Sequence, residues 1–205
     1  MRFDSIIVFG LGAAGANLLL NLIHTVPEAN IYGVDMDKVE PRNYLAGTQP
    51  YLKTHVGKFK TQVMQMLAMQ QGKTLQVFNK EIKDISDIHG IIQSIKSDSI
   101  LIIDAFDNAP SRDLFYKLSE KIWYKKYSEV LHLGFSANMS GEVMWDSSWE
   151  PMVTYKESTD ICTLPGVRSF IMAITAIASM VINDYYFYDN KYSIYFDKYM
   201  KLRKI

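Results

Sequence analysis

The stretch Ser5-Ile-Ile-Val-Phe-Gly10-Leu-Gly12-Ala-Ala-Gly15 decides the expected fold, because it joins an apolar run to three spaced glycines. An apolar helical pattern follows over residues 13–26. Glycine permits a tight turn, lets backbone approach a phosphate, and allows a helix to pack closely on a sheet. The N–H groups and partial positive charge at a helix N-terminus also favour an anion. The stretch therefore predicts a strand, a phosphate-binding turn and a helix.

Short apolar runs alternate with longer helical patterns along the rest of the chain, which favours a parallel sheet covered by helices. Further strands are predicted over residues 31–34, 75–78, 100–104, 130–135, 142–145 and 192–196, with a turn near Gly141. Further helices are predicted over 56–71, 88–95, 111–126 with Ser111 as N-cap, and around the apolar stretch 170–182. We expect an α/β, Rossmann-like, mostly parallel sheet with helices on both faces and a small antiparallel C-terminal extension. One domain over residues 1–205 accounts for all of it.

Composition excludes several classes of function. Lys plus Arg equals Asp plus Glu at 22 each, so no overall charge draws the chain to nucleic acid or to a membrane surface. The longest apolar stretch, 170–182, has roughly 13 residues, short of the ~20 that a membrane span needs. The chain opens almost directly on a strand, without a secretory leader, so we expect a cytoplasmic protein. His24, His55, His89 and His132 form no spaced pair, and core or surface roles are expected for them.

An acidic residue completes the evidence for a nucleotide. Asp35 follows the second predicted strand, twenty residues beyond Gly15, where a carboxylate can accept hydrogen bonds from ribose hydroxyls. The alternative is that the glycines serve only helix packing, and the position of Asp35 argues against it. These residues do not distinguish ATP from a dinucleotide.

Motifs spread over nearly the whole chain distinguish an ATP site from a dinucleotide site. After the second strand stand Asp35, Asp37, Val39, Glu40 and Asn43. Val56-Gly-Lys-Phe-Lys60 follows, then Asp107-Asn108 with Arg112, and finally Cys162-Thr-Leu-Pro-Gly-Val167 before an apolar helix. In this order the motifs resemble the ATP-using adenylation domains of the ThiF, MoeB and ubiquitin-activating superfamily.

The resemblance implies a reaction and roles for residues. Members bind ATP and Mg²⁺ and let the C-terminal carboxylate of a ubiquitin-like protein attack the α-phosphate, which gives an acyl-adenylate and pyrophosphate. By resemblance, Asp35 holds the ribose, Lys60 neutralises phosphate charge, and Asp107 binds Mg²⁺ through the substrate phosphates or orients the reacting groups. The nucleotide site would comprise Gly10, Gly12, Gly15, Asp35, Asp37, Asn43, Lys60, Asp107 and Asn108. The alternatives without a role in nucleotide binding are that Lys60 is a solvated helix residue and that Asp107 and Asn108 only form a turn and helix start.

Two features depart from the family pattern. The family follows its asparagine with Leu-x-Arg-Gln, whose arginine contacts the triphosphate, but here Ala46 occupies that place. Arg42 is nearby, on the other side of Asn43. The paired Cys-x-x-Cys zinc site of many members needs more than the one cysteine present, so no zinc is expected.

That cysteine has two interpretations. Cys162 lies in a segment that resembles the Cys-Thr-Leu loop from which some ubiquitin-activating enzymes form a thioester, and a thiolate there could take the acyl group from the adenylate. The alternative is a packed loop cysteine with no chemical role, as related members that form no thioester also keep it.

Three functions follow. The leading hypothesis is an adenylyltransferase that activates the C-terminus of a small ubiquitin-like or sulfur-carrier protein, as a homodimer or as a heterodimer with a homologous subunit. The second is a catalytically impaired nucleotide-binding or scaffold subunit of such a system, favoured by Ala46. The third is an NAD-dependent oxidoreductase, supported by the glycines but by no catalytic Tyr-x-x-x-Lys or His–Asp arrangement in the sequence.

Overall fold

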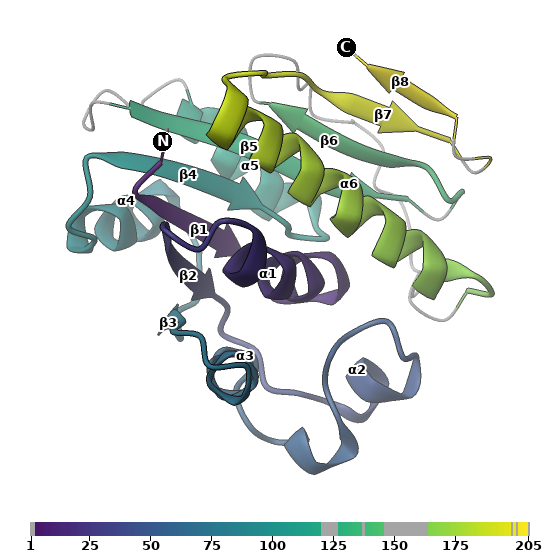
Figure 1. Ribbon diagram of the computed structural model, residues 1–205. Coiled ribbons are helices and arrows are strands. Elements are labelled where there is room, and N and C mark those ends of the chain that lie inside the picture. The colour runs from purple at the N-terminus through teal and green to yellow at the C-terminus, as the bar shows by residue number, and fades with distance from the viewer. Residues whose placement is uncertain are drawn as a thin grey trace.

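A computed structural model gives the structure of the chain and describes residues 3–119, 127–136, 138–145, 164–197, 199 and 201–204. Helices and strands alternate through the first two thirds of the chain (Figure 1). Their bounds are β1 Ser5–Phe9, α1 Ala13–Thr25, β2 Asn30–Val34, α2 Pro41–Leu45, the 3-10 helix η1 Lys53–His55, α3 Lys60–Gln70, β3 Gln76–Phe78, α4 Ile85–Ser94, β4 Ser99–Asp104, α5 Ala109–Ser119, β5 Tyr127–Phe135, β6 Gly141–Trp145, α6 Val167–Tyr188, β7 Ile194–Phe196 and β8 Leu202–Lys204.

The described strands form one eight-stranded sheet in the order β3-β2-β1-β4-β5-β6-β7-β8. The first five are parallel, whereas β6, β7 and β8 pair antiparallel. The α/β fold, the mostly parallel sheet and the antiparallel C-terminal extension are thus confirmed. The strand order reverses between β1 and β4, and in open α/β sheets a ligand binds beyond the carboxyl ends of the strands at such a point.

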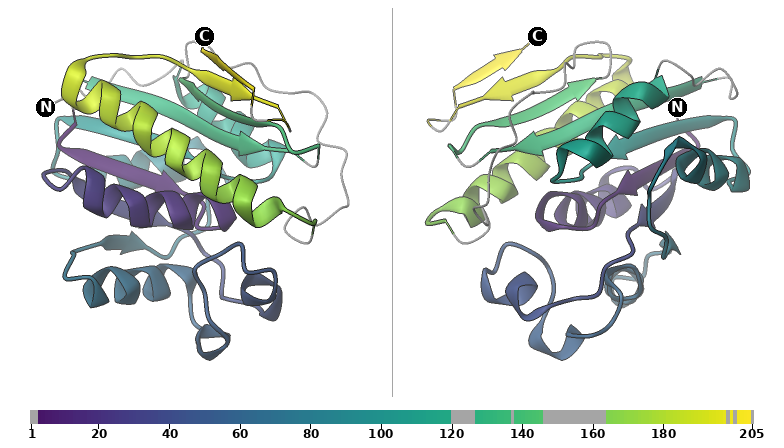
Figure 2. Two further views of the ribbon diagram at one scale, coloured as in Figure 1. Left: turned by 45° about the vertical axis from the view of Figure 1, so that its right-hand side comes forward. Right: turned by 180° about the vertical axis from the view of Figure 1, so that it is seen from behind.

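Side chains alternate between two cores because the strands have a period of two. In β1, Ile6 and Val8 face the core beneath α1, α3 and α6, whereas Ile7 and Phe9 face the core beneath α4 and α5. Both faces of the central strands are therefore covered by helices, as predicted: Figure 1 shows the α1 and α6 side in front, and the right-hand view of Figure 2 shows the α4 and α5 side from behind. This burial explains the unbroken apolar runs in the sequence.

Helix α6 is longer than its apolar stretch suggested, since it runs from Val167 to Tyr188 over 22 residues. Of the described residues, only α6 has the length and composition to cross a membrane, and 56% of its most apolar window is buried here. It packs beside α1 on the same face of the sheet (Figures 1 and 2). This packing buries the apolar face of α6 within the protein.

Several predicted boundaries were wrong for identifiable reasons. The helix predicted from residue 56 begins only at Lys60, because Gly57 has a φ of 86° and Phe59 forms a β-bridge with Lys38. Ser111 is not an N-cap: α5 begins at Ala109, and the Asn108 side chain accepts the hydrogen bond from the Ser111 N–H.

The turn predicted near Gly141 is confirmed just before that residue, where the Met139 N–H donates to the Ser136 carbonyl at 3.0 Å, and Gly141 itself is the first residue of β6. A Cβ atom there would lie 2.4 Å from the Phe196 ring, so glycine is needed for packing against β7. The sequence also missed α2, η1 and β8. The predicted loop 146–166 lies largely outside the described residues, as does the end of the helix predicted to reach residue 126.

Candidate nucleotide-binding site

The glycine turn leaves β1 and enters α1 at the strand-order reversal. Gly10 has a φ of 87°, and a Cβ atom on Gly15 would lie 1.9 Å from the Gly10 carbonyl oxygen, so both positions require glycine. At Gly12 a Cβ atom would meet no atom within 4 Å. Gly12 is the N-cap of α1, and no side chain caps the helix. The N-cap residue therefore supplies no side chain to the first N–H groups of α1, which leaves these donors for an anion.

Asp35 and Tyr51 fix this turn from the β2 side. The Asp35 carboxylate accepts hydrogen bonds at 2.7 Å from the N–H groups of Leu11 and Asp37. The Tyr51 hydroxyl donates to the Leu11 carbonyl at 2.7 Å. Both side chains are buried. Tyr51 was not predicted as a site residue, since nothing in the sequence indicates that it reaches a residue forty positions earlier.

Burial governs the ionisation of this pair. Desolvation raises the pKa of the Asp35 carboxyl, although the Lys60 ammonium and the two backbone N–H donors act against that shift. Burial, with the negative charges of Asp35 and Asp37, raises the pKa of the Tyr51 phenol well above its ordinary value. Tyr51 therefore stays a neutral hydrogen-bond donor at neutral pH.

Lys60 lies with the two aspartates. Its ammonium donates to Asp37 at 2.8 Å and lies 3.8 Å from Asp35. The lysine side chain is 9% exposed and that of Asp37 is 51% exposed. The structure thus excludes the interpretation of Lys60 as a solvated helix residue. Its charge is shared with carboxylates, so a phosphate would have to compete with Asp37 for it.

Asn43 lies in α2, close in the chain to Asp35 and Asp37. Its side-chain oxygen accepts from the Glu40 N–H at 2.7 Å and completes a capping box at the start of α2. This gives Asn43 a local structural role, and a contact between its amide and a nucleotide stays a prediction.

The loop after β4 reaches the other side of the glycine turn. The Ala105 N–H donates to the Phe9 carbonyl at 2.9 Å, and a Cβ atom on Gly10 would lie 3.0 Å from the Ala105 oxygen. Asp107 follows on this loop and is exposed. Within the described part of the chain its carboxylate makes no hydrogen bond or ion pair. Asn108 caps α5, which bears out its interpretation as a helix-start residue without excluding a second role.

A buried polar network lies under this loop. Asp104 accepts from the Phe106 N–H at 3.1 Å and contacts His132 Nδ1 at 3.0 Å. The guanidinium of Arg112 lies 3.6 Å from Asp104 and 2.9 Å from Glu142. These four side chains are at most 9% exposed. The network joins β4, β5, β6 and α5, and it fixes the backbone that carries Asp107.

The described residues provide no group of three or more His, Cys, Asp or Glu side chains able to hold a metal alone. Magnesium is bound in many nucleotide sites by one or two carboxylates together with phosphate oxygens. The unpaired, exposed carboxylate of Asp107 fits that mode. Cys162 lies outside the described residues, so neither interpretation of it is tested.

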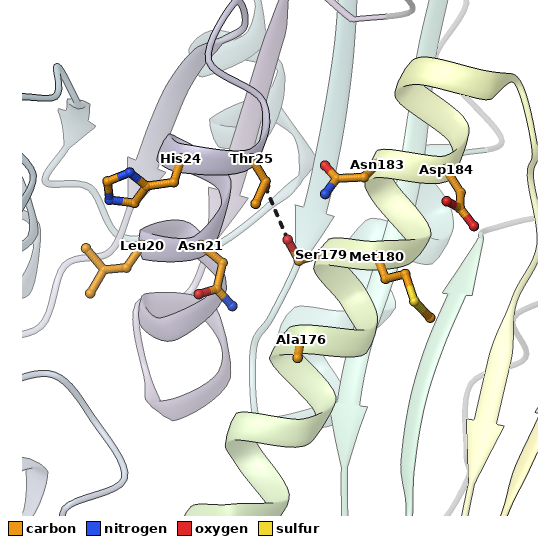
Figure 3. Close-up of a pocket in the computed structure, with 9 residues that line it drawn as sticks. All are labelled: Leu20, Asn21, His24, Thr25, Ala176, Ser179, Met180, Asn183 and Asp184. Carbon is orange, nitrogen blue, oxygen red and sulfur yellow. Dashed lines mark hydrogen bonds between the residues drawn. The ribbon is translucent and has the colours of Figure 1, made fainter.

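A cavity of about 500 Å³ lies elsewhere, between α1 and α6 (Figure 3). Its lining comes from the C-terminal half of α1 and the middle and C-terminal part of α6: Leu20, Asn21, His24, Thr25, Ala176, Ser179, Met180, Asn183 and Asp184. These residues are at the opposite end of α1 from the glycine turn, so the cavity is not the predicted nucleotide site.

Comparison with known proteins decides the family. Residues 1–184 match the ThiF family. This chain belongs to the ThiF family. No curated protein sequence matches this chain.

Solved structures share the fold of this ThiF-family chain at low identity. One is E. coli MccB with AMPCPP and MccA, with a TM-score of 0.73, 14% identity, and 98% of this chain covering 63% of MccB. E. coli MccB with ATP gives a TM-score of 0.71 at 14% identity, covering 98% of this chain and 62% of MccB. PaaA gives 0.70 at 15% identity, covering 98% and 63%. The chain therefore spans less than two thirds of these proteins.

Proposed function

We propose that this protein is an ATP-dependent adenylyltransferase that activates the C-terminal carboxylate of a small ubiquitin-like or sulfur-carrier protein. A carboxylate oxygen attacks the α-phosphorus of ATP, the bond to the β-phosphate oxygen breaks, and acyl-adenylate and pyrophosphate result. Two observations support the proposal in this ThiF-family chain: Asp35 binds the Leu11 N–H of the glycine turn and lies 3.8 Å from the Lys60 ammonium. Asp107, without a partner among the described residues, follows the loop whose Ala105 adjoins the same turn.

The position of each residue suggests its part. Asp35 is fixed beside the turn by Leu11 and Asp37, where it can accept hydrogen bonds from ribose. Lys60, next to it, supplies positive charge for phosphate oxygens. Asp107 would hold Mg²⁺ together with phosphate oxygens, and the bound metal would supply positive charge next to the leaving pyrophosphate.

The partner is proposed from chemistry and from the family. MccB has been solved with AMPCPP and with MccA, so a nucleotide and a second component bind within that fold. Dimerisation, or pairing with a homologous subunit, is supported by apolar side chains that α6 leaves exposed: Met172, Met180, Phe187 and Tyr188. Sedimentation of the full chain at several concentrations measures this association directly.

Pyrophosphate exchange tests the activity. Labelled pyrophosphate should enter ATP only when a carrier protein ending in Gly-Gly is added, and carriers from the same genome are the reagents to try. Lys60→Ala and Asp107→Asn should abolish exchange. Lys53→Ala and Asp113→Asn, at exposed positions on η1 and α5, are the matched controls and should exchange normally. Unchanged exchange in the first pair would remove those residues from the reaction.

A second candidate is a nucleotide-binding subunit without catalysis. Ala46 stands where the family pattern has an arginine, and Lys60 is partly neutralised by Asp37. Mg-ATP binding without exchange, at high protein concentration and with every carrier, would favour this subunit. Exchange that appears only after a homologous subunit is added would assign the chain to a heterodimer.

A further inference from the structure

Binding a triphosphate requires positive charge beside the glycine turn. Two cations of that region already have carboxylate partners. Lys60 donates to Asp37, and the exposed Arg42 pairs with Glu40 at 2.6 Å. An unpaired cation at the same edge would therefore contribute most of the additional attraction.

Arg168 is in a suitable position. It is the second residue of α6, directly after Val167, which is buried with Ala13 and Ile171 in one apolar cluster. Ala13 is the first residue of α1, next to the open N-cap at Gly12. The packing of Val167 thus holds the start of α6 against the end of α1 that faces the predicted phosphates.

The side chain of Arg168 extends to the loop after α2. Its Nη1 donates to the Gly47 carbonyl oxygen. The same loop is fixed to α1 by Asn17, whose amide donates to Ala13 at 2.7 Å and to Thr48 at 2.8 Å. The start of α1, the loop and the guanidinium are therefore joined. Figure 1 shows α2 and the first turn of α6 at the same end of the molecule.

No residue that the structure describes compensates the charge of Arg168. Among the residues that the structure describes, no carboxylate pairs with it, and the Gly47 carbonyl is its recorded polar partner. A guanidinium has five N–H donors in a planar fork that matches phosphate oxygens. The bond to Gly47 directs the group and leaves other donors for a ligand. The side chain is exposed, so a ligand can reach it.

We propose that Arg168 binds the β- and γ-phosphates of ATP and provides the positive charge that Ala46 does not. This inference rests on the proposed function, since it assumes that the glycine turn holds ATP. It assigns the triphosphate contact to α6 and makes Arg168 part of the binding machinery of this chain.

Calorimetry with two nucleotides tests the assignment. The probes are Mg-AMPCPP, which carries a triphosphate that resists α–β cleavage, and AMP, which has no β- or γ-phosphate. We expect Arg168→Ala to weaken AMPCPP binding roughly 10- to 100-fold, the range for losing charge-assisted hydrogen bonds. AMP binding should change less than about twofold. Arg42→Ala, which removes an exposed arginine of α2 that is paired with Glu40, is the matched control, and this variant should bind both nucleotides normally.

A relocated charge provides the second measurement. Residue 46 is partly exposed at the end of α2, so an arginine can be placed there without disturbing the core. The double variant Ala46→Arg/Arg168→Ala should regain most of the AMPCPP affinity. If the double variant stays as weak as Arg168→Ala, loss of charge is not the cause, and the assignment is overturned.

The outcomes separate the inference from the proposed function. If the unmodified chain binds neither AMPCPP nor AMP, the nucleotide site itself is wrong. If it binds AMPCPP and Arg168→Ala binds equally well, only the role of Arg168 is wrong. An equal loss of AMPCPP and AMP affinity would show that Arg168 merely supports the loop, and would also overturn the assignment.

Discussion

Replacing Arg112 by methionine should destabilise the protein far more than the same change at Arg42. The side chain of Arg112 is 3% exposed and lies between Asp104, 0% exposed, and Glu142, 9% exposed. Methionine keeps much of the buried volume but leaves two carboxylates in the interior without the guanidinium. Removing one partner of a buried ion pair costs about 3–5 kcal/mol. Asp104 keeps contacts with His132 and the Phe106 N–H, so we expect the lower end, about 3 kcal/mol.

Urea denaturation followed by circular dichroism measures this free energy of unfolding. The pair of Arg42 with Glu40 is 69% and 56% exposed, and exposed pairs contribute about 0–1 kcal/mol, so Arg42→Met should cost no more than that. Adding Glu142→Gln to Arg112→Met should recover part of the loss by removing a buried charge. A cost below about 1 kcal/mol for Arg112→Met, equal to that of Arg42→Met, would refute the view that the guanidinium balances buried carboxylates.

Three further changes test other parts of the structure. Gly15→Ala should unfold the chain or displace the turn, because its Cβ atom would lie 1.9 Å from the Gly10 oxygen; circular dichroism and AMPCPP binding check this. Tyr51→Phe should cost about 1 kcal/mol in urea, because a buried carbonyl loses its donor. Burial, together with the hydrogen bond that its hydroxyl donates to Asp184, raises the pKa of Tyr192 to about 12. The neutral Tyr192 phenol stabilises the fold by roughly 1–2 kcal/mol below pH 10, and this stabilisation is lost as the pH rises toward 12. The difference in unfolding free energy between wild type and Tyr192→Phe should therefore shrink over that range. A difference that stays constant would contradict this prediction.

The parallel half of the fold could be predicted from sequence because its signals are local. The glycines, the buried runs of β1 and β4, and the leucine face of α1 each report a structure set by neighbouring residues. Short elements gave weaker signals. Helix α2 has only five residues. The signals for it in the sequence are Pro41 in the first turn and the spacing of Glu40 and Asn43, which suits a capping box. Strand β8 is exposed along its length, so it has no apolar pattern to detect.

Only part of the candidate site could be predicted from the sequence. Asp35, Lys60 and Asp107 stood out by their order along the chain, and the structure brings the first two together. His132 did not stand out, because its partner Asp104 is 28 residues away in the sequence. Only the parallel pairing of β4 with β5 sets these two residues opposite each other. Contacts made by register or across helices, such as that of Arg168 with Gly47, require the folded chain.

The glycine turn is held from two sides by groups that would not touch the reacting atoms. On the β2 side, Asp35 and Tyr51 bind the N–H and the carbonyl of Leu11. On the β4 side, Asp104 binds the Phe106 N–H and so fixes the loop that leads to Asp107. A site whose hydrogen-bond donors are already oriented needs little reorganisation energy when a charged ligand binds. It follows that Tyr51→Phe, or a change in the Asp104 cluster, should weaken nucleotide binding without removing any group that binds the nucleotide, whereas Arg168→Ala should weaken triphosphate binding without loosening the turn.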